Sequence, residues 1–248
     1  MKSFCFLIFF VPIVIFAQND VASLLSQGAA LEKQQKEPEA LEKYKEVLKK
    51  DPNNLTALTS ASFLSSKIGV RSSGDTKVKL YNDARGYGER AIKTAPNDAE
   101  ANYVMGVAMG RIAEFSDTKQ KIEYSKDVKR YAEAALEADK THAGAWHLLG
   151  KWNYGVKDLG ATKMLIIKTI YGGLPKASFE TAIECYNKAI KYDSDYILYY
   201  LDLAKTYEKL GQKDNAKAVL KKAMALTPKY VDDPKYLVEC RQMYSNLN

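Results

Sequence analysis

The sequence predicts an all-α fold, a right-handed α-solenoid of about five helix pairs with inserts between helices and a C-terminal capping helix. Three observations lead to this prediction. Proline-containing turns recur at 51–54 (DPNN), 95–98 (APND) and 227–230 (TPKY), each after a segment with helical, alanine-containing periodicity. The segments 21–54 and 197–230 are both 34 residues long. When they are aligned, small residues fall near positions 8, 20 and 27 and proline falls near position 32.

The small residues at fixed positions have a packing reason. Two antiparallel helices approach closely only where their side chains are small, and large side chains then fill the remaining holes. In the alignment of the first and last units, Ala40 matches Ala216 and Pro52 matches Pro228. A 34-residue period with this pattern resembles the tetratricopeptide repeat (TPR).

The middle of the chain fits this period only if residues are inserted between the two helices of a unit. The predicted units are 21–54, 55–98, 99–142, 143–196 and 197–230, followed by a cap at 231–248. The second, third and fourth units carry 10, 10 and 20 residues beyond the 34-residue period, and the composition of 72–77 (SSGDTK) indicates a loop. The cap has an acidic start, a proline near its first turn and apolar residues at helical spacing, so it should cover the last unit.

The longest insert contains GATKMLIIKTIYGGLPKA, residues 160–177, whose centre is apolar apart from Lys168 and Thr169. Gly172 and Pro175 should end its helix. The segment is too short to span a bilayer, which takes ~20 apolar residues. We favour a short apolar helix packed against the solenoid, and contact with a membrane surface is the alternative.

The first residues, MKSFCFLIFFVPIVIFAQND, follow the plan of a secretory signal peptide. Lys2 precedes an apolar run over 4–16, and Ala17 is followed by polar residues. We therefore expect a signal peptide at 1–17, cleaved near Ala17, and an exported protein that is periplasmic or associated with the cell envelope. The TPR-like helical repeat domain would then cover 18–248. An uncleaved N-terminal anchor is the alternative.

Charge and motifs argue against nucleic-acid binding and catalysis. The formal net charge is +7, but lysine and glutamate are interspersed along the helices, as on solvated helix faces, and no long basic run occurs. The sequence contains no HExxH, CxxC, GxSxG or phosphate-binding-loop motif. We therefore expect no enzyme, no cofactor and no metal site. A hydrolase with an unrecognised carboxylate pair remains an alternative.

Two cysteines follow the predicted signal peptide. Cys185 is assigned to the second helix of the fourth unit, and Cys240 to the cap, beyond the whole fifth helix pair. Packed helices lie ~8–10 Å apart, and a disulfide needs Cα atoms within about 7 Å. We therefore expect two separate buried thiols.

The candidate site is the concave face of the solenoid. Positions 2, 5, 9 and 12 of the first helix in each unit form one stripe at helical spacing. In and after the central units this stripe carries an aromatic and basic set: Phe63, Tyr103, His147, Lys151, Tyr154 and Lys205. Such a set suits an extended peptide with an acidic or C-terminal carboxylate, or an anionic lipid headgroup. Alternatively, inserted segments fill the groove and these residues are internal packing. His147 is expected to be a packed or hydrogen-bonding histidine and not a metal ligand.

The fourth unit resembles a particular family. HLLGKW at 147–152, Tyr154, the apolar insert and PKASFETA at 175–182 are similar to the C-terminal domain of the regulator of microtubule dynamics family, as is ANYVMGVAMGRIAEF at 101–115. The likeness covers roughly residues 55–230. It implies a TPR-like helical domain, and its eukaryotic members are linked to microtubules and some to lipid binding at organelle contacts. The signal-like N-terminus instead resembles exported proteins of Bacteroidota-type bacteria, where no microtubules would be met, so only the fold and the groove are carried over.

The leading functional prediction is a non-catalytic, exported TPR-like scaffold that binds a protein or peptide ligand of unknown identity in its groove. The first alternative is a lipid-binding helical-repeat protein that takes an anionic lipid in the groove or along the insert 160–177. The hydrolase described above is the further alternative.

Overall fold

The computed structural model describes residues 13–247, with side chains from residue 20 onward, and no strand occurs in that part of the chain. Most of the signal peptide predicted at 1–17 lies outside the described residues. The described helices are α1 (Ile13–Lys33), α2 (Glu37–Lys50), α3 (Leu55–Arg71), α4 (Gly74–Thr94), α5 (Ala99–Ile112), the 3-10 helix η1 (Ala113–Phe115), α6 (Thr118–Ala138), α7 (Ala143–Asp158), α8 (Gly160–Tyr171), α9 (Phe179–Tyr192), α10 (Ile197–Lys209), α11 (Lys213–Met224) and α12 (Asp233–Asn246).

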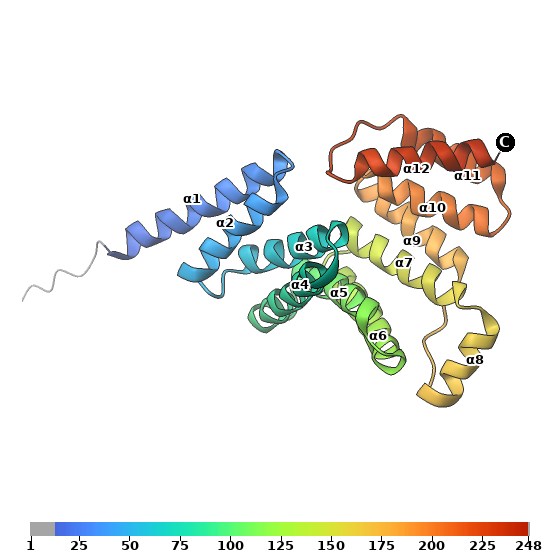
Figure 1. Ribbon diagram of the computed structural model, residues 1–248, viewed down its shortest axis with the longest axis horizontal. Coiled ribbons are helices and arrows are strands. Elements are labelled where there is room, and N and C mark those ends of the chain that lie inside the picture. The colour runs from blue at the N-terminus through green and yellow to red at the C-terminus, as the bar shows by residue number, and fades with distance from the viewer. Residues whose placement is uncertain (1–12, 248) are drawn as a thin grey trace, which may run out of the picture.

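The helices stack as five pairs and a cap. The most extensive packing lies within α1–α2, α3–α4, α5–α6, α7–α9 and α10–α11, and α12 packs on both helices of the last pair. Figure 1 shows the pairs following a curved path, with the N-terminal pair and the cap on facing sides of the molecule. The predicted all-α solenoid with a C-terminal capping helix is therefore confirmed.

The turns between pairs also start the next helix. The side chains of Asn54, Asp98 and His142 accept hydrogen bonds from the backbone N–H three residues on, at 3.0, 2.8 and 3.0 Å. Each bond satisfies an N–H that has no partner in the first turn of a helix, a contribution of about 1 kcal/mol. Proline is absent before α7, and His142 caps that helix in the same way as Asn54 caps α3.

Close helix approach depends on glycine beneath a tyrosine ring. A Cβ atom added to Gly28 on α1 would lie 2.8 Å from Cζ of Tyr44, and one on Gly150 on α7 would lie 2.7 Å from Cε1 of Tyr186. Both tyrosines are only 2% exposed. The small residue at repeat position 8 therefore makes room for an aromatic ring from the second helix of the same pair.

The extra residues of the second and third pairs lengthen helices and do not form long loops. The second helices of these pairs, α4 and α6, are each 21 residues long. Only Ser72 and Ser73 separate α3 from α4, so the loop predicted over 72–77 is wrong beyond Ser73. The two serines interrupt the helix, and the negative charge of Asp75 in the first turn of α4 favours a helix N-terminus at this point.

The insert of the fourth pair is a helix that stands away from the body of the molecule (Figure 1). It ends at Tyr171, and the next residue, Gly172, has a φ of 76°, a left-handed conformation that glycine adopts without strain. No residue of α8 is fully buried. Met164 on α8 and Leu174 in the loop after it are partly buried against the core. The helix therefore packs against the solenoid along one side only, which includes Met164, and leaves most of its apolar surface exposed. Apolar residues surround this helix, so one narrow contact cannot cover them. None of the described helices is both long and apolar enough to cross a membrane.

The segment between α11 and α12, residues 225–232, reaches back to the N-terminal helix pairs. We call it the closing segment. The side-chain amide of Gln35 donates to the carbonyl oxygen of Lys229 at 3.0 Å. A guanidinium nitrogen of Arg71 lies 2.6 Å from a carboxylate oxygen of Asp232. The first two pairs and the cap therefore meet across the concave side.

The two cysteines of the described chain are free and buried in different parts of the core. Cys185 belongs to the cluster formed by α5, α6, α7 and α9, and Cys240 to the cluster around α10, α11 and α12. Burial raises the pKa of each thiol to about 11, so both are poor nucleophiles near neutral pH.

Candidate functional site

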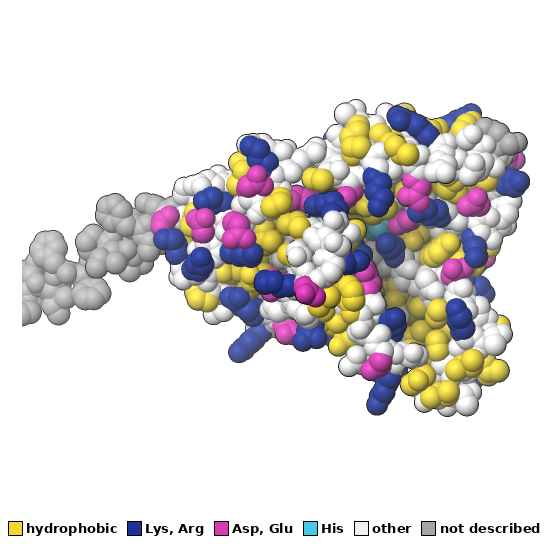
Figure 2. Space-filling view, viewed as in Figure 1, with side chains coloured by type: hydrophobic (Ala, Val, Ile, Leu, Met, Phe, Trp, Pro, Cys, Tyr) yellow, Lys and Arg dark blue, Asp and Glu magenta, His cyan; other side chains and the backbone are white. Residues whose placement is uncertain are grey.

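The concave face contains a cavity of about 290 Å³. The first helices of three pairs, α3, α5 and α7, contribute one part of its lining, and α10, the closing segment and α12 contribute the opposite part. Figure 2 shows the molecule hollowed between these two sides, with a histidine side chain visible there. The inserted segments, which the alternative interpretation places in the groove, do not contribute to its lining. C-terminal elements form the border opposite α3, α5 and α7.

The structure divides the predicted site residues between two neighbouring hollows. Those that line the main cavity are Phe63, Tyr103, His147 and Lys151, and those that line a smaller hollow of about 210 Å³ are Tyr154 and Lys205, together with Lys151. Tyr154 lies further along α7, where its ring packs on that of Phe179 with centroids 5.3 Å apart. This contact turns the tyrosine towards α9 and away from the main cavity.

Tyr103 is held in place from several sides. Its ring centroid lies 5.6 Å from that of Phe63 and 4.7 Å from that of His142. A Cβ atom on Gly144 would lie 2.7 Å from Cζ of Tyr103, so the ring rests on the first turn of α7. Burial raises the pKa of Tyr103 well above its usual range, so the phenol stays neutral. Tyr103 therefore gives the cavity a fixed aromatic wall with a neutral hydroxyl group.

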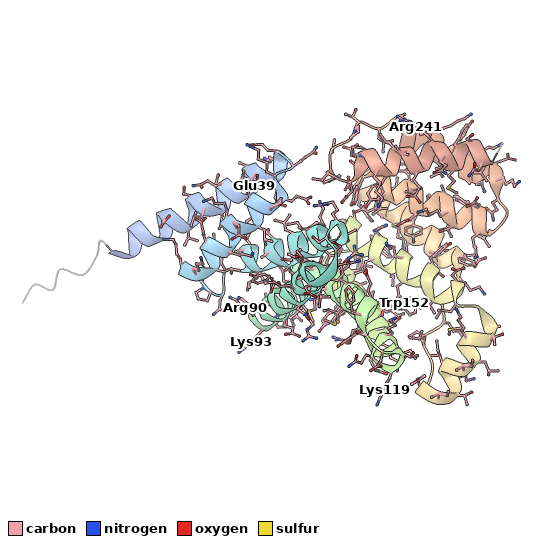
Figure 3. All side chains as sticks on the ribbon, in the orientation of Figure 1. Glu39, Arg90, Lys93, Lys119, Trp152 and Arg241 are labelled. Carbon is pink, nitrogen blue, oxygen red and sulfur yellow. The ribbon has the colours of Figure 1, made fainter. Side chains whose placement is uncertain are left out.

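Trp152, on α7, lines the cavity at the place where α7 packs against α6. Figure 3 labels this residue on α7. Its indole Nε1–H donates to the carbonyl oxygen of Ser125 at 2.7 Å, and the side chain is buried. A buried indole needs a hydrogen-bond partner, and this one is supplied by the backbone of α6. Trp152 therefore ties the third and fourth pairs together beneath the cavity.

His147 and Asp202 form a buried hydrogen-bonded pair at the edge of the cavity. Their Nε2 and Oδ2 atoms are 2.8 Å apart. Burial lowers the pKa of His147 below its usual value, and Asp202 opposes this shift only in part. Burial alone would raise the pKa of Asp202, but the hydrogen bond from His147 and the nearby Lys151 hold it below its usual value. A neutral imidazole therefore donates to an ionised carboxylate. Within the described residues, no cluster of His, Cys, Asp or Glu could hold a metal ion.

This pair predicts a pH-dependent stability. We expect the free energy of unfolding to fall as the pH decreases below 6.5, the ordinary pKa of histidine. Below that pH the unfolded chain protonates His147 while the folded chain keeps it neutral, so the unfolded state binds more protons. The decline continues until the pH reaches the lowered pKa of the folded state. Urea denaturation at about pH 7 and about pH 5 measures the difference.

The matched control uses the other histidine of the chain. His147→Gln should remove most of the pH dependence over this interval, whereas His142→Gln should retain it. An unchanged dependence in His147→Gln would contradict the assignment.

Three basic residues contribute to the cavity lining, and they differ in how far their charges are already paired. Lys67 Nζ lies 2.5 Å from a carboxylate oxygen of Glu37. Arg111 has only a 3.6 Å contact with Glu114, and its buried Nε finds no hydrogen-bond partner in the described chain. Lys151 is exposed. Arg111 and Lys151 are therefore the cations available to an anionic ligand in this cavity.

Sequence reasoning missed Arg111 and the residues on the opposite side of the cavity. Arg111 directly follows Gly110, which is position 12 of the predicted stripe, so its side chain lies beside the stripe and not on it. Tyr196, Asp232 and Tyr236 also line the cavity. The sequence places Tyr236 in the predicted cap and gives it no role in the groove. These residues come from segments far along the chain, and no local periodicity indicates that they turn towards α3 and α5.

Comparison with known protein families and sequences gives matches over most of the chain. The family model described as "Regulator of microtubule dynamics protein 1-3" matches residues 24–248. Regulator of microtubule dynamics protein 1 of Caenorhabditis elegans is 25% identical over 177 residues, which are 71% of this chain and 78% of that protein. The Mus musculus protein of the same name is 26% identical over 238 residues, 94% of this chain and 77% of that protein. The resemblance noted in the sequence is confirmed.

Solved structures agree on the architecture. A thermophilic TPR protein from Thermus thermophilus superposes with a TM-score of 0.68 at 17% identity, covering 90% of this chain and 99% of that one. PilF of Pseudomonas aeruginosa superposes with a TM-score of 0.57 at 12% identity, covering 94% of this chain and 90% of that one. At such low identity the likeness shows the fold alone.

Proposed function

The chain belongs to the regulator of microtubule dynamics protein 1–3 family, and on that premise we propose that it is a non-catalytic scaffold that binds a protein or peptide in its concave cavity. The TPR-like fold supports a role in protein interaction. The observation that carries the finer proposal is the cavity of about 290 Å³, which is bordered by helices from the second pair to the cap. Family membership and fold are both typical of proteins without catalytic activity.

The lining suits an extended peptide that carries a carboxylate. Phe63 and Tyr103 offer a fixed aromatic wall for an apolar side chain, with their rings 5.6 Å apart. Arg111 and Lys151 offer positive charge, because the contact of Arg111 with Glu114 is 3.6 Å long and Lys151 is exposed. Aromatic and arginine side chains are the residue types that dominate binding energy in protein interfaces. The carboxylate of the peptide would pair with these cations.

The test is retention of a partner by the immobilised full chain. The signal-like sequence at 1–17 supports a partner in the cell envelope, so envelope and cytosolic fractions are both applied. We expect a partner to be retained from the envelope fraction. Tyr103→Ala combined with Lys151→Ala should weaken its binding by at least about tenfold, because an aromatic anchor and a cation are lost.

The smaller hollow supplies a matched control. Tyr154→Ala combined with Lys205→Ala makes the same two chemical changes outside the main cavity. Binding should survive in this control. Equal retention by the Tyr103 and Lys151 double variant, or the absence of any retained partner, would overturn the proposal. Loss of binding in the control alone would move the site to the smaller hollow.

A further inference from the structure

Helix α8 carries an unusual concentration of exposed apolar side chains. Leu165, Ile166 and Ile170 are exposed by 64, 50 and 64%. No other helix in the described chain bears more than one large hydrophobic residue of comparable exposure. Figure 2 shows hydrophobic side chains gathered over this projecting part of the molecule. Single exposed apolar residues are ordinary, but a contiguous group marks an interaction surface.

The charges carried by α8 and by the loop that follows it have one sign. Between residues 159 and 179 the chain contains Lys163, Lys168 and Lys176 and no acidic residue. At about 100° per residue, the three exposed apolar side chains span about 140° of the helix surface, with Lys163 beyond one edge and Lys168 beyond the other. Lysine side chains at the edges of an apolar stripe can keep their ammonium groups in water while their stems cover apolar surface.

We propose that α8 is a membrane-docking helix that lies in the surface of a bilayer containing anionic lipids. The exposed apolar stripe would enter the interfacial layer, and the flanking lysines would meet negatively charged headgroups. Charge selects this occupant over a second copy of the same chain, because two α8 helices would bring lysines of the same sign together. With 12 residues, α8 is suited to lying on a membrane and not to crossing it.

The position of α8 in the fold leaves its exposed apolar stripe free to face a membrane. The helix follows α7 directly, and no residue of α8 is buried in the solenoid. The helix contacts the core of the solenoid through Met164, which lies on a different side of α8 from Leu165 and Ile166. The proposal does not depend on peptide binding, because the cavity lining does not include residues of α8.

Flotation with lipid vesicles tests the proposal in the full chain. Vesicles of equal parts phosphatidylcholine and phosphatidylglycerol are compared with vesicles of phosphatidylcholine alone. We expect flotation with the anionic vesicles that weakens as ionic strength rises. Lys163→Gln combined with Lys168→Gln should lower the affinity about thirtyfold. Replacing Leu165, Ile166 and Ile170 by serine should lower it by about a hundredfold or more.

The control variant has the same total charge as the α8 lysine variant, and all variants share the same N-terminus. Lys213→Gln combined with Lys222→Gln removes the same charge from exposed positions on α11, and its affinity should match that of the parent. Every variant retains the apolar run at 4–16, so any binding by that run is common to all of them. Equal flotation of the parent and the triple serine variant, or no flotation of the parent, would overturn the proposal.

A second measurement reports insertion without removing the apolar stripe. A fluorophore is attached through Ile166→Cys, or through Val238→Cys on α12 as a control, with Cys5 replaced by serine in both. The buried thiols of Cys185 and Cys240 should not compete for the label, because their pKa is about 11. Quenchers within the bilayer should quench the fluorophore at 166 and not the one at 238. Equal quenching at both positions would contradict docking through α8.

Discussion

Gly150→Ala is expected to destabilise the chain by about 1–3 kcal/mol, whereas the same change in a Tyr186→Ala background should be neutral or stabilising. The new Cβ would lie 2.7 Å from Cε1 of Tyr186, and both residues are buried inside the fourth pair. Tyr186→Ala alone should cost about 3–5 kcal/mol, because it removes a ring that is 2% exposed. Once the ring is gone, alanine no longer meets it and gains up to about 1 kcal/mol of helix propensity over glycine.

Urea denaturation of the parent, the two single variants and the double variant measures this coupling. Gly155 is the matched control, because it lies on the same helix and an added Cβ there meets no atom within 4 Å. Gly155→Ala should therefore be mildly stabilising with or without Tyr186. A Gly150→Ala cost that persists at full size in the Tyr186→Ala background would show that the ring is not its cause.

The second large effect is expected at Glu37. Replacing both Lys67 and Arg71 by methionine should cost about 3–5 kcal/mol, since a buried carboxylate loses both of its partners. The side chain of Glu37 is only 4% exposed, one of its oxygens lies 2.5 Å from Lys67 Nζ, and the other contacts Arg71. Either single replacement should cost much less, because one cation remains beside the carboxylate.

Denaturation of the triple variant that also carries Glu37→Gln provides the decisive comparison. Removing the charge should restore part of the lost stability, because a neutral amide is less costly to bury than an unpaired carboxylate. The control is Lys43→Met with Lys45→Met, whose partners Glu46 and Glu42 have side chains 42 and 66% exposed. That pair of changes should cost less than about 1 kcal/mol. A triple variant no more stable than the double would refute this account of Glu37.

Much of the fold could be predicted from the sequence because repeat packing leaves a local signature. Gly150 and Ala182 occur at positions where helices must approach, and Asn54 and Asp98 occur where helices begin. Such positions depend on contacts within one unit or between adjacent units. The helix from 160 and its contact with the solenoid were also predicted, but the small extent of that contact was not, since the side that meets the solenoid depends on how the chain leaves α7.

The candidate site was predicted only on the side that carries the repeat. Tyr103 and His147 share one stripe because both fall at matching positions of their units, whereas Tyr154 was assigned to the same stripe and lies elsewhere. The contact of Tyr154 with Phe179 could not be read from spacing along α7. Asp232 reaches the cavity through the closing segment, and its partner Arg71 is 161 residues away in the sequence. Long-range contacts of this kind leave no periodic pattern.

The closing segment changes how the molecule should unfold. In an open stack of repeats each unit contacts only its neighbours, so the terminal units can fray independently. Here the hydrogen bond from Gln35 to Lys229 joins residues 194 apart in the sequence, and the Arg71–Asp232 pair acts beside it. Opening either end therefore breaks contacts made by the other, and the two ends share a cooperative unit. Contacts of such large sequence separation also form late and slow the folding of a helical chain.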